Sequence, residues 1–406
     1  MTGHDPAALN RRGFLQTGAL ATASAMTLAD GATAADSPAS KPTLPRRPLG
    51  KTGVELTVLD LGTFRKPGAA DRLIRLAYAQ GIRVFDTADC YGTEPTLARW
   101  FRERPEVRKE IFLVTKDHPR GGPRELIPQL DRRLAQLQTD YVDLFFIHGI
   151  GPREYGRQSL QWPKSKEFKE TIEAIKKSGK ARFVGFSCHD ALRAEYLQAA
   201  ADGGFIDAIM LQYTPWLAQD APLNRALDAC HKKGIGLISM KQVAGHADLQ
   251  EVFRRAPMLK DKGLTPYQGL LHAIWTDERI TTCCVSMVNT DQIRENVAAA
   301  QRFEPLKKAE IDQLRDACLA ASPTFCADCD GRCARAAGTD AALGDLTRLL
   351  TYYDHYGYRS EARRQYAALS EAERCWHGAD LDAARRACPN DLNFAALLPR
   401  VDRHLA

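Results

Sequence analysis

The chain has 406 residues and carries 56 Lys and Arg against 50 Asp and Glu, which gives a formal net charge of +6. This charge is small for the length, and the basic residues are dispersed without a stripe of interleaved aromatic residues, which argues against nucleic-acid binding. A hydrophobic fraction of 44% and a charged fraction of 26% are ordinary for a globular protein and indicate neither disorder nor a membrane-spanning chain. The length suffices for one large α/β domain and a smaller appendage.

The first 34 residues have the order of a twin-arginine export signal. Arg11 and Arg12 precede Gly-Phe-Leu, a mildly apolar run and the cleavage-type sequence Ala32-Thr33-Ala34. The apolar run is too short and too rich in Ala and Thr for a stable membrane anchor. We therefore expect the export machinery as a partner, a periplasmic or secreted location, and a linker at residues 35–47. The alternative is a cytoplasmic protein in which the paired arginines are incidental.

From residue 48 onward, apolar runs of strand length alternate with amphipathic helical patterns. The expected strands are Thr57–Leu61, Val84–Asp86, Ile111–Lys116, Val142–His148, Phe183–Ser187, Ala208–Gln212, Gly236–Met240 and Cys283–Ser286. The expected helices are Asp71–Gln80, Glu125–Leu137, Glu167–Ser178, Ala191–Ala201, Leu223–Lys233, Pro266–Trp275 and Asp291–Ala299.

This alternation predicts a (β/α)₈ barrel. Strands that are apolar on both faces suit a parallel sheet covered by helices, and eight such units in roughly 250 residues fit the size of a closed barrel. An open doubly wound sheet is the alternative, but no Gly-x-Gly-x-x-Gly follows an early strand. We place the barrel at residues 48–310 and a mainly helical, cysteine-rich extension at residues 311–406.

Polar side chains stand where consecutive apolar strands end. Asp86, Lys116 and His148 are three of them, and Tyr91 follows Asp86 in a loop that ends at Gly92. Each alone has a plain structural interpretation, such as a helix cap, a solvated lysine or a hydrogen-bonded core histidine. Together they predict one site, because the carboxyl ends of barrel strands meet at one face.

The chemistry of these groups fits proton transfer. A phenol has an unperturbed pKa of about 10, and a neighbouring Lys116 ammonium would lower it. Asp86 would pair with Lys116, and His148 would hydrogen-bond the substrate oxygen. Tyr91 would then act as general acid in one direction of a reaction and as general base in the reverse direction, with no metal required.

These motifs resemble the aldo-keto reductase superfamily over about Pro48 to Pro305. They are Asp86-Thr-Ala-x-x-Tyr91, Lys116 after Leu-Val-Thr, His148 after Asp-Leu-Phe-Phe-Ile, the early Leu-Gly-Lys-Thr-Gly and the late Gln292-x-x-Glu295-Asn296. The resemblance implies a barrel that binds a nicotinamide cofactor and transfers hydride between it and an aldehyde, ketone or alcohol, sugars included. The alternative function is a cofactor-bound sensor or scaffold subunit on the same barrel.

The resemblance also implies which residues hold the cofactor. NADP(H) is the first expectation from the resemblance. However, many family members have an arginine where this chain has Gln292 and a lysine near Ser286. A guanidinium binds a phosphate in a way that Gln does not, so NAD(H) is the alternative. Ser187 and Gln212 are expected at the nicotinamide carboxamide. The full expected set is Gly62, Thr63, Ser187, Gln212, Met240, Lys241, Ser286, Gln292, Glu295 and Asn296.

Five cysteines crowd the C-terminal portion. Here the chain resembles barrel reductases with a ferredoxin-like extension, in which three closely spaced cysteines and a distant Cys-Pro bind a [4Fe–4S] cluster. The implied ligands are Cys326, Cys329, Cys333 and Cys388, with Cys375 as a substitute. Structural disulfides and a zinc site are the alternatives. A cluster and an electron-transfer partner would let an exported enzyme recycle a tightly held cofactor.

Overall fold

The computed structural model describes the chain from residue 43 to its end, except for short gaps. The described residues are 43–64, 70–217, 219–242, 249–324, 326, 331–355 and 357–406. The predicted export signal and the predicted ligand Cys329 lie outside the described residues.

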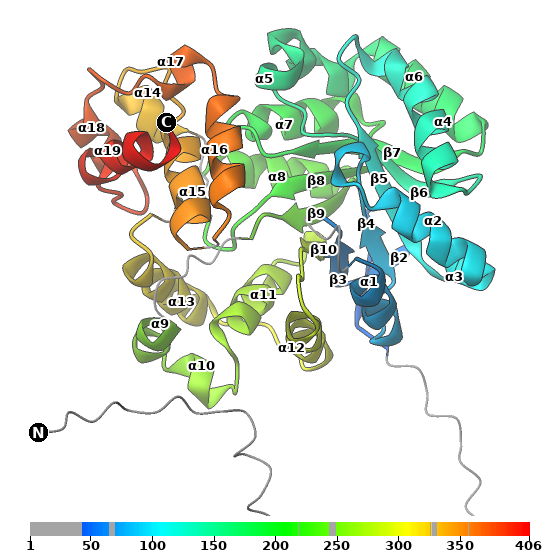
Figure 1. The fold of residues 1–406 in the computed structure, drawn as a ribbon, viewed down its shortest axis with the longest axis horizontal. Coiled ribbons are helices and arrows are strands. Elements are labelled where there is room, and N and C mark those ends of the chain that lie inside the picture. Colours follow the sequence, from blue (N-terminus) through cyan, green and yellow to red (C-terminus); the bar gives the residue numbers. More distant parts are fainter. Residues whose placement is uncertain are drawn as a thin grey trace, which may run out of the picture. The chain divides into compact units, whose positions relative to one another are not determined.

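Eight parallel strands close into a barrel, as predicted (Figure 1). Around the ring, each strand pairs with its neighbours in the chain, and the last strand pairs with the first. The strands are β3 (Leu59–Gly62), β4 (Val84–Asp86), β5 (Phe112–Asp117), β6 (Val142–Ile147), β7 (Ala181–Cys188), β8 (Ala208–Gln212), β9 (Gly236–Met240) and β10 (Ile280–Val285).

A short antiparallel hairpin of β1 (Arg46–Pro48) and β2 (Glu55–Thr57) precedes the barrel. Leu49 and Leu56 of this hairpin belong to the apolar cluster that fills the barrel interior, together with Val84 and Ala208 at the starts of their strands. The hairpin therefore closes the amino-terminal end of the barrel. Because Thr57 pairs within the hairpin, β3 begins two residues later than the sequence pattern predicted.

Helices cover the outside of the ring. The helices are α1 (Ala70–Ala79), α2 (Glu94–Glu103), α3 (Pro105–Glu110), α4 (Leu126–Leu137), α5 (Pro152–Tyr155), α6 (Lys166–Lys177), α7 (Arg193–Gly203), α8 (Pro222–Lys232), α9 (Leu249–Arg255), α10 (Met258–Asp261), α11 (Pro266–Thr276), α12 (Thr290–Gln301) and α13 (Lys308–Ala321). The seven predicted helices lie within two residues of their observed ends.

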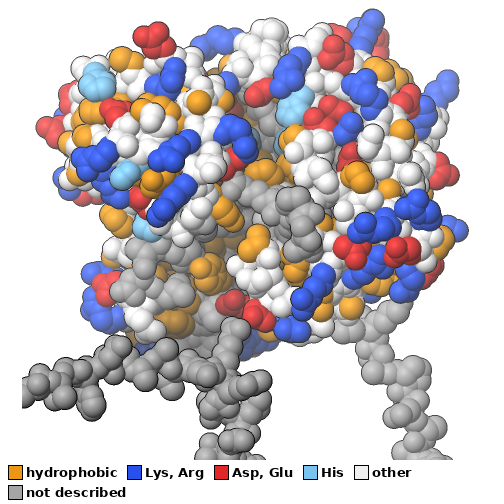
Figure 2. All heavy atoms as spheres, in the orientation of Figure 1, with side chains coloured by type: hydrophobic (Ala, Val, Ile, Leu, Met, Phe, Trp, Pro, Cys, Tyr) orange, Lys and Arg blue, Asp and Glu red, His pale blue; other side chains and the backbone are white. Residues whose placement is uncertain are grey.

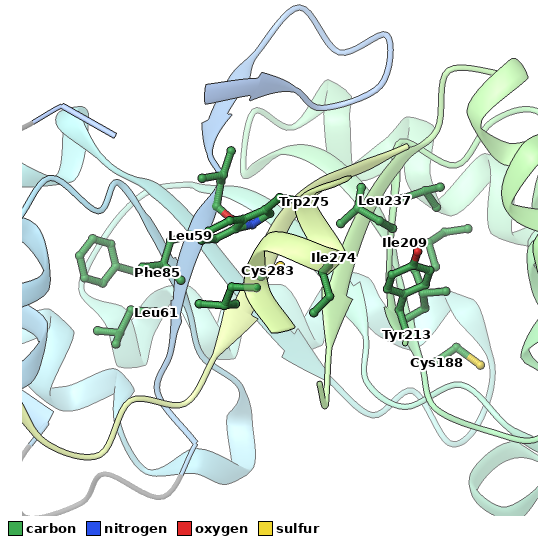
Figure 3. Packing of buried hydrophobic residues seen from close by; sticks show 14 of the residues in the cluster. Leu59, Leu61, Phe85, Cys188, Ile209, Tyr213, Leu237, Ile274, Trp275 and Cys283 are labelled. Atoms are coloured by element: carbon green, nitrogen blue, oxygen red, sulfur yellow. The ribbon is translucent and has the colours of Figure 1, made fainter. Parts of the chain in front are cut away.

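The main apolar core lies between the strands and these helices. Figure 3 shows Leu59, Leu61, Phe85 and Trp275 of α11 among the side chains of this core, all of them fully or nearly fully buried. The Trp275 indole N–H donates to the carbonyl of Val58 at 2.8 Å. This bond satisfies the one polar atom that the indole brings into the core.

A second core holds the C-terminal extension together. It forms among α14 (Arg332–Ala336), α15 (Leu343–Asp354), α16 (Arg359–Ala367), α17 (Glu371–Arg374), α18 (Leu381–Ala387) and α19 (Phe394–Leu405). Leu314 and Cys318 of α13 pack instead into the core of the barrel. The predicted boundary between residues 310 and 311 thus falls inside α13, which belongs to the barrel by its packing.

The surface visible in Figure 2 mixes charges of both signs, with Lys and Arg side chains interspersed among Asp and Glu. Among the helices of the described residues, none is long and apolar enough to cross a membrane.

Candidate active site

Strand alternation brings the predicted catalytic residues into the barrel. Successive side chains of a strand point to opposite faces. Val84 and Val114 belong to the cluster inside the ring, so Asp86 and Lys116, two residues further on, also point inward. His148, Gln212, Met240 and Ser286 likewise stand two residues after the interior residues Phe146, Met210, Ile238 and Cys284.

Lys116 and Asp86 form a buried ion pair at the carboxyl end of β4 and β5. The Lys116 ammonium donates to both carboxylate oxygens of Asp86 and, at 3.0 Å, to the carbonyl of Thr87. The Lys116 side chain is 1% exposed and that of Asp86 is 3% exposed. Burial alone would lower the pKa of Lys116, but the Asp86 carboxylate outweighs this effect and the pKa is raised. Lys116 therefore stays charged.

Tyr91 lies directly over this ion pair. It ends a short 3₁₀ turn (Asp89–Tyr91), which Gly92 leaves with a φ of 68°. The Lys116 Nζ is 5.2 Å from the centre of the Tyr91 ring, and the Tyr91 hydroxyl is 3.5 Å from Nε2 of His148. The structure thus brings all four predicted catalytic residues together.

The protonation state of Tyr91 differs from the sequence expectation. Burial raises the pKa of the Tyr91 phenol, and the opposing effect of Lys116 is smaller. The expectation considered only the ammonium and left out the loss of water around the hydroxyl. In the protein described here Tyr91 is a neutral phenol that carries its proton.

His148 is held by a second acid, Asp89. The Asp89 carboxylate lies 3.6 Å from Nδ1 of His148 and accepts from Nδ1 of His118 at 3.3 Å. Burial alone would raise the pKa of Asp89, but the two histidines hold it well below its usual range. Burial also lowers the pKa of His148 to about 4, so this imidazole is neutral.

The two ring nitrogens of His148 have different neighbours. Nδ1 lies 3.6 Å from the Asp89 carboxylate and 3.9 Å from Sγ of Cys90, while Nε2 faces the Tyr91 hydroxyl. An ionised carboxylate can only accept hydrogen bonds, so a hydrogen on Nδ1 suits the Asp89 side and leaves Nε2 a lone pair for the Tyr91 hydroxyl. The expected hydrogen bond from His148 to the substrate oxygen stays a prediction.

The residues expected at the nicotinamide lie at neighbouring strand ends and already have partners. Ser187 Oγ accepts from the backbone N–H of Gly149 at 2.8 Å and so braces the turn after His148. The buried Gln212 accepts from Nη1 of Arg348 at 2.7 Å. Met240 and Lys241 are half-buried at the end of β9, where Lys241 has a φ of 54°.

The resemblance places Ser286, Gln292, Glu295 and Asn296 at the adenosine end of the cofactor. Ser286 directly follows β10, and the other three residues lie on α12. A Cβ on Gly62 would come within 3.4 Å of Ser286 Oγ, so these two positions adjoin. The Gln292 side chain accepts from the backbone N–H of Val288 at 2.8 Å.

The other members of this expected set also have partners or are buried. Thr63 shares a 2.7 Å hydrogen bond with Thr93, the Glu295 carboxylate accepts from the Thr265 hydroxyl, and Asn296 is buried on α12.

Three of the predicted cluster ligands gather around the core of the extension. Cys333 is buried in that core, and Cys326 and Cys388 pack against it. Burial raises the pKa of Cys388, and a smaller electrostatic effect of Cys326 acts in the same direction. Cys375 is exposed at the end of α17.

Several residues of the site were not singled out from the sequence. Asp89 lies between Asp86 and Tyr91 on the same short loop. This place in the sequence could have indicated that Asp89 belongs to the site. Asp60 and Cys284 each place an oxygen or sulfur atom within 4.8 Å of an Asp86 oxygen inside the barrel. Arg348 reaches the site from the extension, and no sequence pattern pointed to it.

The fold and site together define a (β/α)₈ barrel with a buried Lys–Asp pair beneath a tyrosine. The model of the aldo/keto reductase family matches residues 60–318. The chain therefore belongs to the aldo/keto reductase family of oxidoreductases.

Relatives of known name agree with this family. Aldo-keto reductase family 1 member A1 of Mus musculus is 25% identical over 295 residues, which cover 65% of this chain and 87% of that protein. L-galactose dehydrogenase of Arabidopsis thaliana is 27% identical over 291 residues, which cover 64% of this chain and 89% of that protein. A crystal structure of a thermostable aldo-keto reductase in complex with the inhibitor epalrestat superimposes with a TM-score of 0.55 at 24% identity. It covers 68% of this chain and 100% of that one, and it shows the shared fold.

Proposed function

We propose that this chain transfers hydride between NADP(H) and an aldehyde, ketone or alcohol substrate, sugars included, with Tyr91 as the proton donor and acceptor. The observation that carries the proposal is the buried stack of Asp86, Lys116 and Tyr91 beside His148. A permanently charged ammonium next to a neutral phenol stabilises the phenolate that forms when the proton leaves. Structural packing alone does not require such an arrangement.

The roles of the residues follow from their protonation states. The bound nicotinamide supplies or receives the hydride. During reduction, Tyr91 gives its proton to the substrate oxygen as negative charge develops there, and Lys116 stabilises the phenolate left behind. Asp86 keeps Lys116 in place, and His148 orients the Tyr91 hydroxyl. During oxidation, the phenolate takes the proton back.

The choice between NADP(H) and NAD(H) depends on groups near α12. A guanidinium binds a phosphate through two parallel hydrogen bonds, whereas Gln292 offers one amide, which already accepts from the backbone of Val288. We propose NADP(H) from the family and keep NAD(H) as the alternative. Affinities measured for both cofactors decide between them.

We also propose that the extension holds a [4Fe–4S] cluster. Cys326, Cys333 and Cys388 gather at one core, and thiolates are the ligands such clusters take. When bound, the cluster would supply one-electron transfer to a partner protein. Anaerobic purification with iron and sulfide analysis tests this proposal, and an iron-free, colourless protein would overturn it.

We further propose export through the twin-arginine pathway. Arg11 and Arg12 followed by Gly-Phe-Leu and a small-residue cleavage sequence support it. Fractionation of cells that express the full chain tests this proposal. Replacing both arginines by lysine should retain the protein inside the cell.

The proposed function is tested with the full chain. Titration with NADPH and NADH should show binding of at least one, and a panel of aldehydes, ketones and sugars should show turnover. Binding without turnover of any substrate would favour the sensor or scaffold function. Failure to bind either cofactor would overturn both functions.

A further inference from the structure

A charged side chain of the extension, Arg348, reaches the mouth of the barrel. Arg348 of α15 donates from Nη1 to Oε1 of Gln212 at 2.7 Å, across 136 positions of sequence. Only 10% of the Arg348 side chain is exposed, and the Gln212 residue is 2% exposed. Gln212 ends β8 at the carboxyl face of the ring, where the other strand-end residues of the site lie.

Other contacts hold α15 at this position. Arg153 of α5, on the barrel side, pairs with Asp345 at 2.9 Å and with Glu373 at 2.6 Å. Asp345 also lies 4.0 Å from Arg348, one turn along the same helix. At the other end of α15, the Thr351 hydroxyl donates to the carbonyl of Thr324 at 3.0 Å. The guanidinium of Arg348 is therefore anchored from its own helix and from the barrel.

This contact fixes which way the amide of Gln212 faces. A guanidinium only donates hydrogen bonds, so its partner on Gln212 must be the carbonyl oxygen. The two ends of a glutamine amide are otherwise nearly equal in shape, and an unrestrained amide can rotate by half a turn. With its oxygen held by Arg348, Gln212 presents its NH₂ group to any ligand at the end of β8.

We propose that Arg348 is a positioning residue, which holds Gln212 so that its NH₂ group donates to the carboxamide oxygen of the nicotinamide. The proposal rests on the function proposed above, in which Gln212 contacts the carboxamide. By this proposal the extension forms part of the cofactor site. The proposal does not depend on what the C-terminal cysteines bind. In this role Arg348 acts through Gln212.

A double-mutant cycle on the full chain tests this role. Arg348→Met removes the donor and keeps much of the side-chain length, and we expect the Kd for the bound reduced dinucleotide to rise about tenfold, as for the loss of one well-oriented hydrogen bond. Gln212→Ala should weaken binding by a similar factor. In the Gln212→Ala background, Arg348→Met should have no further effect, because Arg348 acts only through Gln212.

Three further measurements distinguish a positioning role of Arg348 from a general loosening of the extension. Arg153→Met removes only exposed ion pairs to Asp345 and Glu373, which contribute little to the placement of α15. It leaves the Arg348–Gln212 contact and should leave the dinucleotide Kd unchanged. The nucleotide fragments 5′-ADP and 2′,5′-ADP, which lack the nicotinamide, should bind Arg348→Met as tightly as the unaltered protein. Arg348→Lys keeps a donor and should recover part of the affinity.

The outcomes distinguish this inference from the function on which it rests. If the unaltered protein binds no dinucleotide, the proposed function fails, and the inference fails with it. If Gln212→Ala weakens binding but Arg348→Met does not, only the positioning role is overturned. Equal losses from Arg348→Met in both backgrounds, or the same loss from Arg153→Met, would also overturn it.

Discussion

The ion pair inside the barrel and the ion pairs at the base of the extension differ in how much water surrounds them. Lys116 and Asp86 are almost completely buried, whereas Arg153 is 41% exposed and its partner Asp345 is 36% exposed. A buried charge that loses its partner is strongly destabilising, while an exposed pair contributes little. The comparison predicts that the Lys116–Asp86 pair is essential to both stability and turnover. The exposed pairs of the extension are predicted to contribute little to either.

Breaking the barrel pair should have the largest effect. Lys116→Met leaves the Asp86 carboxylate buried without its cation, and we expect a loss of about 3–5 kcal/mol in the free energy of unfolding. Turnover should fall by at least ~100-fold, because the phenolate of Tyr91 loses its stabilising charge. Chemical denaturation and steady-state kinetics measure the two effects.

The double variant Lys116→Met, Asp86→Leu sharpens this test. Removing both charges should restore much of the stability but none of the turnover. Lys180→Met, which breaks an exposed pair with Asp131, is the matched control and should change neither quantity. A fully active Lys116→Met protein would contradict the comparison.

A second buried acid should make stability depend on pH. Burial raises the pKa of Glu94 to about 7, against the opposing effects of Arg133 and a hydrogen bond from Thr115. Its folded pKa lies above the unfolded value, so the folded state binds more protons and this contribution to stability is lost as pH rises from about 4.5 to 7. It amounts to up to about 3 kcal/mol.

Glu94→Gln should remove this part of the pH dependence. The measurement is chemical denaturation at pH 5 and at pH 7.5. Glu103→Gln, on the exposed side of the same helix, should keep the dependence of the unaltered protein. An identical slope in Glu94→Gln and the unaltered protein would rule out Glu94 as its source.

Loss of the Asp89 carboxylate should have a moderate effect on turnover. Asp89→Asn no longer requires a hydrogen on Nδ1 of His148, so the direction of the Tyr91 hydroxyl is less well fixed. We expect turnover to fall about tenfold, less than for loss of the general acid itself. Nitrogen NMR of the imidazole reports the tautomer.

The pH profile provides a second readout of the same pair. With the pKa of His148 at about 4 and that of Asp89 well below its usual range, neither group titrates between pH 5 and 8. Titration of these two groups should therefore cause no change in kcat/KM between pH 5 and 8. Unchanged turnover and tautomer in Asp89→Asn would show that Asp89 does not position His148.

The smallest effect is expected at the exposed pairs of the extension. Arg153→Met breaks contacts with Asp345 and Glu373, and thermal unfolding should show a loss of no more than about 1 kcal/mol. A loss as large as that of Lys116→Met would remove the distinction between the two regions.

The barrel could be predicted closely because two rules of strand geometry apply to every unit. Alternation decides which residues face inward, and the parallel arrangement brings all strand ends to one face, so Asp86, Lys116 and His148 meet as expected. The pKa of Tyr91 was not predictable in the same way. It depends on the balance between burial and one ammonium, and a sequence does not show how much water a loop excludes.

The extension has no comparable rule. Its helices have apolar positions that predict packing, but nothing in residues 343–354 indicates that Arg348 faces the barrel rather than solvent. The contact with Gln212 depends on how α15 lies against the ring. Asp89 is an intermediate case, since its place in the Asp86–Tyr91 loop brings it near the site but does not show that it contacts His118 and His148.

The central claim is that the Tyr91 hydroxyl transfers the proton, and one substitution tests it most directly. Tyr91→Phe removes only that hydroxyl, and turnover should fall by at least ~100-fold while the Kd of the cofactor stays the same. Tyr78→Phe, which removes a hydroxyl bonded to Glu110 on the outside of the barrel, should keep full turnover. If Tyr91→Phe turns over substrate at the rate of the unaltered protein, the proposed mechanism is wrong.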